Sequence, residues 1–176
     1  MRSRYTIREP GIPYFITCTV VNWIPLFTRK PYFDVLLDSL QFCRHHKGLK
    51  LYAYVILDNH LHLVVAGDKM AEVIRDFKSY TAKGIIARLE HDRKTWGLNQ
   101  LQHHKHPTKT RSNYQVWQEG FHPQQIVSEA MLQQKVDYLH YNPVRLGVVA
   151  RPEDWLYSSA RDYAGGKGLI ELDALI

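Results

Sequence analysis

The segment Lys50-Leu-Tyr-Ala-Tyr-Val-Ile-Leu-Asp-Asn-His-Leu-His-Leu-Val-Val-Ala66 predicts two adjacent β-strands. Residues 50–57 and 61–66 are rich in Val, Leu, Ile and Tyr, a composition typical of strands. The pair Asp58-Asn59 between them favours a turn. Because alternate residues of a strand project to the same face, His60 and His62 would present two imidazoles about 7 Å apart on one face of a sheet.

Further elements are expected on both sides of this pair of strands. A proline at position 31 and Gly48 mark the start and end of one helix, and Ser128 is a suitable N-cap for another. Pro143 disfavours helical geometry at the residue before it. Expected strands cover residues 14–23 and 114–117, and expected helices cover residues 31–47, 70–90 and 128–142. This order predicts an α+β fold, a ferredoxin-like βαββαβ sandwich with a four-stranded antiparallel sheet and an extra C-terminal helix.

Length and composition indicate one globular domain that covers residues 1–176. Hydrophobic residues make up 45% of the chain, enough to form a core. No apolar run reaches the roughly 18 residues that a membrane span needs, and no signal peptide is visible, so we expect a cytoplasmic protein without membrane contact. Two cysteines cannot form a disulfide framework. Residues 91–113 are expected to form a basic loop, and residues 144–176 a C-terminal tail.

A second chemical pattern is Tyr138-Leu-His-Tyr-Asn142, near the end of the last expected helix. Tyr138 and Asn142 are four residues apart and therefore share a helix face. Tyrosine can act as a covalent nucleophile, and an asparagine oxygen is a suitable ligand for Mg²⁺ or Mn²⁺. The structural alternative is a packed tyrosine followed by a helix stop. Tyr141 lies about 60° from Tyr138 around the helix axis and is a rival nucleophile.

Together the two patterns supply complementary parts of one site. His60, His62 and Asn142 could hold a divalent cation against a phosphate, whose charge the cation would neutralise. Tyr138 could then attack the phosphorus atom. Each pattern alone is weak, because a His-x-His pair on a strand is more often a pair of ordinary histidines on a half-exposed sheet.

The same residues resemble a known family. The stretch Tyr54-Val-Ile-Leu-Asp-Asn-His-Leu-His-Leu-Val-Val65 resembles the metal-binding strand of the single-tyrosine HUH transposases. The stretch Val136-Asp-Tyr-Leu-His-Tyr-Asn-Pro-Val-Arg-Leu-Gly-Val-Val149 resembles the nucleophile helix of their REP-associated tyrosine transposase branch. Residues 116–121 and 152–159 support the resemblance, which extends from about residue 5 to residue 163. Asp58 stands where many relatives carry proline, a change that affects the turn and leaves the ligands in place.

This resemblance implies a metal-dependent endonuclease and strand transferase of DNA transposition and recombination. The substrate would be single-stranded DNA beside a hairpin such as a REP-like palindrome, and cleavage would leave a 5′-phosphotyrosine and a free 3′-hydroxyl. Tyr138 would be the nucleophile, and His60, His62 and Asn142 would hold Mg²⁺ or Mn²⁺. The branch is commonly monomeric, which favours a monomer over a homodimer. Such an enzyme would be associated with the nucleoid.

A DNA substrate also needs positive charge near the site, because phosphate contacts supply most of its salt-dependent affinity. The net charge of +6 is consistent with a polyanionic partner. Arg145, three residues after Asn142, is the first candidate for a phosphate contact. The further candidates are Lys78, Lys83, Lys105, Lys109, Arg111, Arg2 and Arg4.

Two other functions fit parts of the sequence. A replication-type HUH nicking enzyme would share the chemistry and differ in its biological role. A non-catalytic nucleic-acid-binding module, or a DNA-binding remnant of a transposase, would bind without cleaving. The expected sheet order is also that of RNA-recognition domains, but their aromatic signature is missing from the central strands. That reading also leaves His60 and His62 unexplained.

Overall fold

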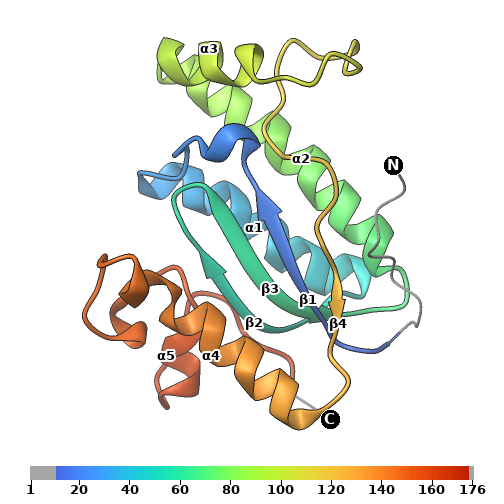
Figure 1. Cartoon of the computed structure of the whole chain (residues 1–176), viewed down its shortest axis with the longest axis vertical. Helices are drawn as coiled ribbons and strands as arrows, with labels where there is room; N and C mark the ends of the chain where they lie inside the picture. The colour runs from blue at the N-terminus through green and yellow to red at the C-terminus, as the bar shows by residue number, and fades with distance from the viewer. Residues whose placement is uncertain (1–10, 175–176) are drawn as a thin grey trace.

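An antiparallel sheet of four strands forms the centre of the computed structural model, which describes residues 11–174 (Figure 1). The strands are β1 (Tyr14–Thr19), β2 (Lys50–Ile56), β3 (His60–Ala66) and β4 (Gln124–Gln125). Their order in the sheet is β2-β3-β1-β4, so β1 lies between β3 and β4. Because this is the arrangement of a ferredoxin-like βαββαβ fold, the predicted fold class is confirmed.

Two helices, α1 (Lys30–Lys47) and α2 (Met70–His91), cover one face of the sheet. Leu40 and Phe77 from these helices are buried in the same hydrophobic core as Ile16 of β1. Helix α1 ends at Gly48, whose left-handed φ of 67° allows its N–H to bond to the carbonyl of Cys43. The helices therefore enclose the main core between themselves and the sheet.

The opposite face of the sheet is covered by α4 (Glu129–Arg145). Ser128 caps this helix as predicted, because its side chain accepts a hydrogen bond from the N–H of Met131 at 3.1 Å. Val136 and Leu139 are buried in a second, smaller core with residues of β2 and β3. Helix α4 thus lies across the face that carries the two histidines of β3.

Helix α4 continues through Pro143 to Arg145, so the predicted helix end near Asn142 is wrong. A proline at this position removes only the hydrogen bond to the carbonyl of Leu139, and the loss is tolerated in the last turn. Pro143 is buried, and its carbonyl accepts a hydrogen bond from the N–H of Val148 at 2.9 Å. Asn142 therefore lies within the helix.

The expected basic loop at 91–113 contains a helix, α3 (Thr95–His103), which corrects that prediction. Leu101 of α3 is fully buried. The backbone at Gly97 approaches Leu89 so closely that a Cβ there would lie 3.2 Å from Leu89 Cδ2. These tertiary contacts stabilise a helix whose basic, histidine-rich surroundings give little local indication of one.

The expected strand at 114–117 is also wrong, because this stretch forms only an isolated bridge between Trp117 and Val20. The chain runs on beside β1 with irregular hydrogen bonds, since Gly120 and His122 both have positive φ angles and bend the backbone. Regular pairing begins only at β4, where Gln124 lies opposite Phe15. The fourth strand therefore exists but lies later in the sequence and is very short.

The residues after α4 pair with the outer edge of β2. They include the 3-10 helix η2 (Pro152–Asp154) and the short helix α5 (Ala160–Tyr163). The segment between η2 and α5 bonds to β2. The N–H of Ile56 donates to the carbonyl of Tyr157 at 2.8 Å, and the N–H of Ser159 donates to the carbonyl of Tyr54 at 2.9 Å. An unpaired sheet edge favours unwanted association. The C-terminal tail therefore protects this edge.

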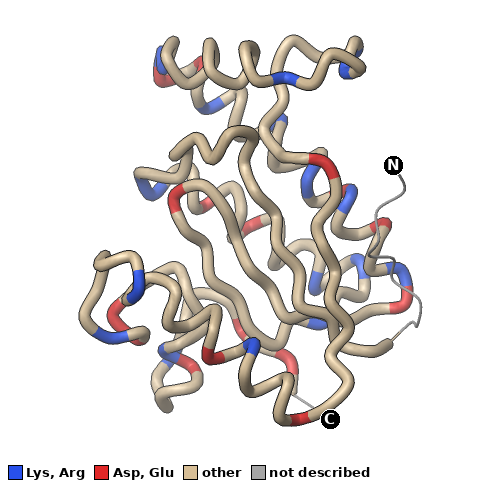
Figure 2. Tube along the Cα trace, viewed as in Figure 1, with Lys and Arg blue, Asp and Glu red and all other residues tan. Residues whose placement is uncertain are grey.

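Charged residues are spread over most elements of the fold (Figure 2). Lys and Arg residues occur on α1, α2 and α4 and in the connection after α3. Within residues 11–174, none of the helices has both the length and the apolar character of a membrane span.

His140 joins α4 to the C-terminal tail. Its Nε2 lies 2.8 Å from Oγ of Ser159. That hydroxyl donates to the carbonyl of Tyr54 and accepts from the N–H of Tyr54. Because a hydroxyl has one proton, Nε2 of His140 must be the donor. Burial lowers the pKa of His140 to about 4, although Asp137 opposes the shift, so this imidazole is neutral at neutral pH.

We expect acid to destabilise the protein partly through His140. The unfolded chain gains a proton on this histidine near pH 6.5 and the folded chain only near pH 4, so the free energy of unfolding falls as the pH drops between these values. The loss from this residue between pH 7 and pH 5 should be about 2 kcal/mol. Urea unfolding at both pH values measures it. The free energy of unfolding should depend less on pH in His140→Gln than in the wild-type protein. In His45→Gln, which changes an exposed histidine, the pH dependence should equal that of the wild-type protein. Equal dependence in all three proteins would contradict the assignment.

Candidate active site

His60 and His62 of β3 lie side by side on the sheet face under α4. Their ring centroids are 4.9 Å apart, with an angle of 77° between the ring planes. The register of β1 and β3 places Thr17 opposite His62. Strand alternation thus brings both imidazoles to one face, as the sequence pattern predicts.

Tyr138 of α4 packs directly against His62. The ring centroids of these residues are 5.5 Å apart, and both rings contact Phe15, at 5.9 Å from Tyr138 and 5.2 Å from His62. Tyr138 is 43% exposed, whereas His62 is 6% exposed. A tyrosine that solvent can reach therefore covers a buried histidine.

The imidazole of His60 is oriented by Asn59. Nδ1 of His60 lies 2.6 Å from Oδ1 of Asn59, while Nδ2 of Asn59 donates to the carbonyl of Trp23 at 3.1 Å. The second bond fixes the amide orientation, so the atom that faces His60 is an oxygen and can only accept. Nδ1 of His60 must therefore carry the proton, which leaves a lone pair on Nε2.

His62 is held in a similar way by Thr17, whose Oγ1 lies 2.8 Å from Nδ1. Nε2 of His62 is buried and has no hydrogen-bond partner within residues 11–174. Burial, with smaller contributions from His60 and Lys135, lowers the pKa of His62 to about 3. Burial also lowers the pKa of His60, although Asp58 opposes the shift. His62 has a free Nε2 lone pair when Thr17 accepts the proton on Nδ1. Neutral imidazoles with such a lone pair are suitable metal ligands.

The remaining residues of the predicted site lie at the end of α4. Asn142 is one helical turn after Tyr138, half-buried, and its side chain makes no hydrogen bond in the described part of the chain. The Arg145 guanidinium lies 5.0 Å from the Tyr138 ring centroid and donates to the Tyr138 carbonyl at 3.2 Å. Tyr141 is 50% exposed and makes no ring contact with any described residue, whereas Tyr138 contacts His62.

The other predicted DNA contacts are more dispersed. Nζ of Lys78 donates hydrogen bonds to the carbonyls of Gln118 and Gly120. Nζ of Lys105 donates hydrogen bonds to the carbonyls of Lys109 and Ser112. Burial lowers the pKa of Lys78. Lys83 and Arg111 are exposed, and Lys109 lies 3.5 Å from Glu119. Arg2 and Arg4 lie outside the described residues.

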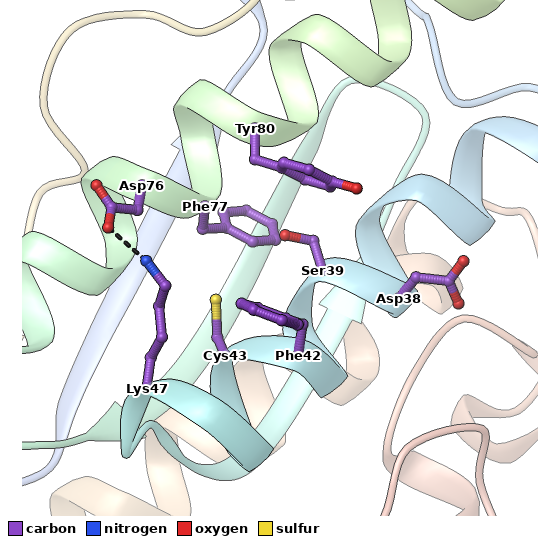
Figure 3. Close-up of a pocket in the computed structure, with 8 residues that line it drawn as sticks. All are labelled: Asp38, Ser39, Phe42, Cys43, Lys47, Asp76, Phe77 and Tyr80. Atoms are coloured by element: carbon purple, nitrogen blue, oxygen red, sulfur yellow. Dashed lines mark hydrogen bonds and ion pairs between the residues drawn. The ribbon is translucent and has the colours of Figure 1, made fainter.

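A separate groove lies between α1 and α2, on the other side of the sheet (Figure 3). Its volume is about 410 Å³, and the ion pair of Lys47 with Asp76 borders it. The remaining lining residues are Asp38, Ser39, Phe42, Cys43, Phe77 and Tyr80. The groove contains no histidine and does not belong to the candidate active site.

The sequence has a relative among named proteins. No family model matches the chain. A Haemophilus influenzae protein named as a REP-associated tyrosine transposase is 31% identical over 123 residues. The match covers 68% of this chain and 62% of the relative, so the chain spans less than two thirds of the relative's length.

The fold also has a solved counterpart, described as a REP-associated tyrosine transposase bound to a REP hairpin. The TM-score is 0.67 at 21% identity, over 99% of this chain and 92% of the other. A Deinococcus radiodurans structure named as a transposase covers 79% of this chain and 97% of its own at 17% identity, but its TM-score of 0.47 is too low to establish a common fold.

In sequence the chain is similar to a named transposase, and it shares its fold with a solved one. The sequence relative is named as a REP-associated tyrosine transposase, which confirms the resemblance that the motifs indicate.

The contact with Asn59 predicts that His60 carries its proton on Nδ1. NMR of protein labelled with ¹⁵N-histidine, at neutral pH and without metal, should show an unprotonated Nε2 for His60. Asn59→Ala removes the acceptor and should allow the Nε2–H tautomer to appear. Asn99→Ala, at an exposed asparagine of α3, is the matched control and should leave the spectrum of His60 unchanged. A dominant Nε2–H tautomer in the wild-type protein would contradict the orientation described above.

Proposed function

We propose that this chain is a single-stranded DNA endonuclease and strand transferase, a transposase that acts at DNA hairpins such as REP elements. One observation carries the proposal: the Tyr138 ring lies 5.5 Å from that of His62, whose buried Nε2 has no hydrogen-bond partner among the described residues. In this position Tyr138 would be a nucleophile beside an imidazole that could bind a metal. The named sequence relative and the hairpin-bound structure support the same class of substrate.

The divalent cation of this proposal, Mg²⁺ or Mn²⁺, would be held by His60, His62 and Asn142. Both imidazoles offer Nε2, and the amide oxygen of Asn142 is a ligand that these cations accept. Among residues 11–174, no group of three or more His, Cys, Asp or Glu could hold a metal. The proposed site has two histidines, and Asn142 would supply its third ligand. When bound, the cation would neutralise and polarise the scissile phosphate.

Tyr138 would supply the nucleophile. Its phenolic oxygen forms a bond to phosphorus while the bond from phosphorus to the 3′ oxygen breaks, which gives a 5′-phosphotyrosine and a free 3′ end. The phenol loses one proton and the leaving 3′ oxygen gains one, so the step is balanced. Attack of a 3′-hydroxyl on the phosphotyrosine reverses the step and joins strands. The same residue therefore accounts for both cleavage and transfer.

Arg145 would position Tyr138 and attract the substrate. Its bond to the Tyr138 carbonyl holds the guanidinium above the ring, at 5.0 Å from the centroid. This positive charge beside the proposed nucleophile would attract the negatively charged phosphate. Lys135, 4.9 Å from the Phe15 ring centroid, adds charge on the same side.

Another surface suits the phosphates of the hairpin stem. A groove of about 680 Å³ lies between α2 and residues 109–121, with Arg75, Lys83 and Lys109 among the residues that line it. Lys83 is exposed and would contact phosphates, whose binding to such side chains is salt-dependent. Each hairpin would be bound by a monomer, in the cytoplasm at the nucleoid.

We expect cleavage to depend on Tyr138. The protein is incubated with labelled hairpin DNA from the flanks of its own gene, with Mg²⁺ or Mn²⁺, and denaturing gels should show a protein-linked strand. Tyr138→Phe removes the nucleophilic oxygen and should reduce this product to below about 1% of the wild-type amount. Tyr141→Phe, at a tyrosine of similar exposure on the same helix, should retain it.

Other results would change the proposal in defined ways. Loss of the linked strand in Tyr141→Phe alone would transfer the role to Tyr141. Binding without cleavage on all flanking hairpins would favour a DNA-binding remnant. Efficient nicking at a replication-origin-type site, without joining, would favour a replication-type enzyme.

The metal ligands are tested separately, by Mn²⁺ titration calorimetry without DNA. His60→Ala and His62→Ala should each abolish measurable binding, because each removes an Nε2 ligand. Asn142→Ala should weaken it, and Thr17→Val should weaken it about 10- to 100-fold by releasing the His62 ring. Binding by His62→Ala at wild-type affinity would refute this metal site. The exposed His45→Ala variant controls for adventitious binding.

A further inference from the structure

A cleft of about 740 Å³ opens beside His60, and neither Tyr138 nor His62 is among the residues that line it. One wall comes from the loop between β1 and α1, and another from the chain that follows α4. The turn between β2 and β3, which includes Asp58 and Asn59, also borders it. The cleft therefore joins the predicted metal ligand His60 to the end of the helix that carries Tyr138.

Trp23 stands at this cleft with more than half of its surface, 54%, exposed. Its ring centroid is 5.4 Å from that of His60, in an edge-to-face arrangement. Trp23 has a left-handed φ of 55°, and Asn22 before it has one of 51°. A bulky residue rarely adopts this conformation, and such strain persists only where surrounding contacts impose it.

Backbone contacts hold Trp23 in this position. Its carbonyl accepts the hydrogen bond from Asn59 Nδ2 at 3.1 Å, and its N–H donates to the carbonyl of Val20 at 3.1 Å. The N–H of Val20 in turn donates to the carbonyl of Asn59 at 2.9 Å. Because Asn59 also contacts His60, the position of the indole is coupled to the orientation of the predicted ligand.

Three other aromatic residues that line the cleft pack against one another. Phe33 and Tyr157 are stacked with centroids 3.6 Å apart, and Trp155 contacts both rings edge to face. These rings have their partners within the protein. Trp23 differs from them, because its ring contact within the described residues is with His60 alone, which leaves indole surface open to a ligand.

The charges around the cleft do not favour a phosphate in it. Arg29 is paired with Asp92 at 2.5 Å, and Lys30 with Asp34 at 2.8 Å. The exposed Asp58 adds a negative charge. A flat, uncharged heteroaromatic group suits such a surface better, and stacking on an exposed aromatic side chain is how proteins bind unpaired bases.

We propose that this cleft binds one unpaired nucleobase of the single-stranded DNA, stacked on Trp23, adjacent to the phosphate that is cleaved. The inference rests on the proposed function for its ligand class. It adds a base-binding subsite formed by Trp23 and the β2–β3 turn. The phosphate of that nucleotide would lie at the edge of the cleft, beside His60.

Fluorescence anisotropy with labelled hairpin DNA that carries single-stranded flanks tests the subsite. The Tyr138→Phe background prevents cleavage during the measurement. Trp23→Ala should weaken binding about 5- to 100-fold, the effect of losing one base–aromatic stack. Trp23→Phe, which keeps a smaller ring, should bind with intermediate affinity. Tyr80→Ala, at a 68% exposed aromatic residue on the far side of the sheet, should bind like the parent protein.

A scan of the flanks with abasic sites identifies the stacked base. One abasic position should weaken binding to the parent protein and have no further effect on Trp23→Ala. Unchanged binding by Trp23→Ala, or an abasic effect of equal size in both proteins at every position, would overturn the subsite.

If DNA is not cleaved by the wild-type protein but binding depends on Trp23 in this way, the subsite stands and the enzymatic proposal fails. If cleavage occurs and Trp23→Ala binds normally, only the subsite fails. Failure of the parent protein to bind the DNA at all would overturn both.

Discussion

The antiparallel pairing of β1 with β3 is the constraint on which the candidate active site depends. Its register places Thr17 opposite His62 and turns His60 and His62 towards α4. A slip of one residue would turn both histidines into the core beneath α1 and α2 and expose Leu61 and Leu63. Both leucines are fully buried, so the slip is strongly disfavoured. The hydrophobic core on one face of the sheet thereby fixes the direction of the imidazoles on the other.

Helices and strands could be predicted from the sequence where the local pattern of apolar residues was strong. The strands at 50–66 and helices α1 and α2 follow from composition, periodicity and end signals. Helix α3 could not be predicted in this way, because its stability depends on contacts of Leu101 and Gly97 with distant parts of the chain. The position of β4 also depends on neighbours, since two residues of pairing leave no recognisable alternation.

The candidate site was predictable to a similar extent. Strand alternation indicated His60 and His62, and the family resemblance favoured Tyr138 over Tyr141. How these residues approach one another depends on how α4 crosses the sheet, which no local pattern encodes. Thr17 lies 45 residues before its partner and gave no signal. Asn59 directly precedes His60, so a turn amide beside a candidate ligand was a usable signal that sequence reasoning did not exploit. For Trp23, only the three-dimensional contact with that turn indicates a role.

The proposed function makes two opposed demands on these groups. Imidazoles must stay neutral to offer Nε2, which burial achieves, since it lowers the pKa of His62 to about 3. The substrate, however, must reach the same atoms. Tyr138 meets both needs, because its ring shields His62 from water while 43% of its surface stays exposed. A larger covering element would exclude DNA, and a smaller one would hydrate the histidine and raise its pKa. Covering the proposed ligand with the proposed nucleophile would therefore keep the site both unprotonated and accessible.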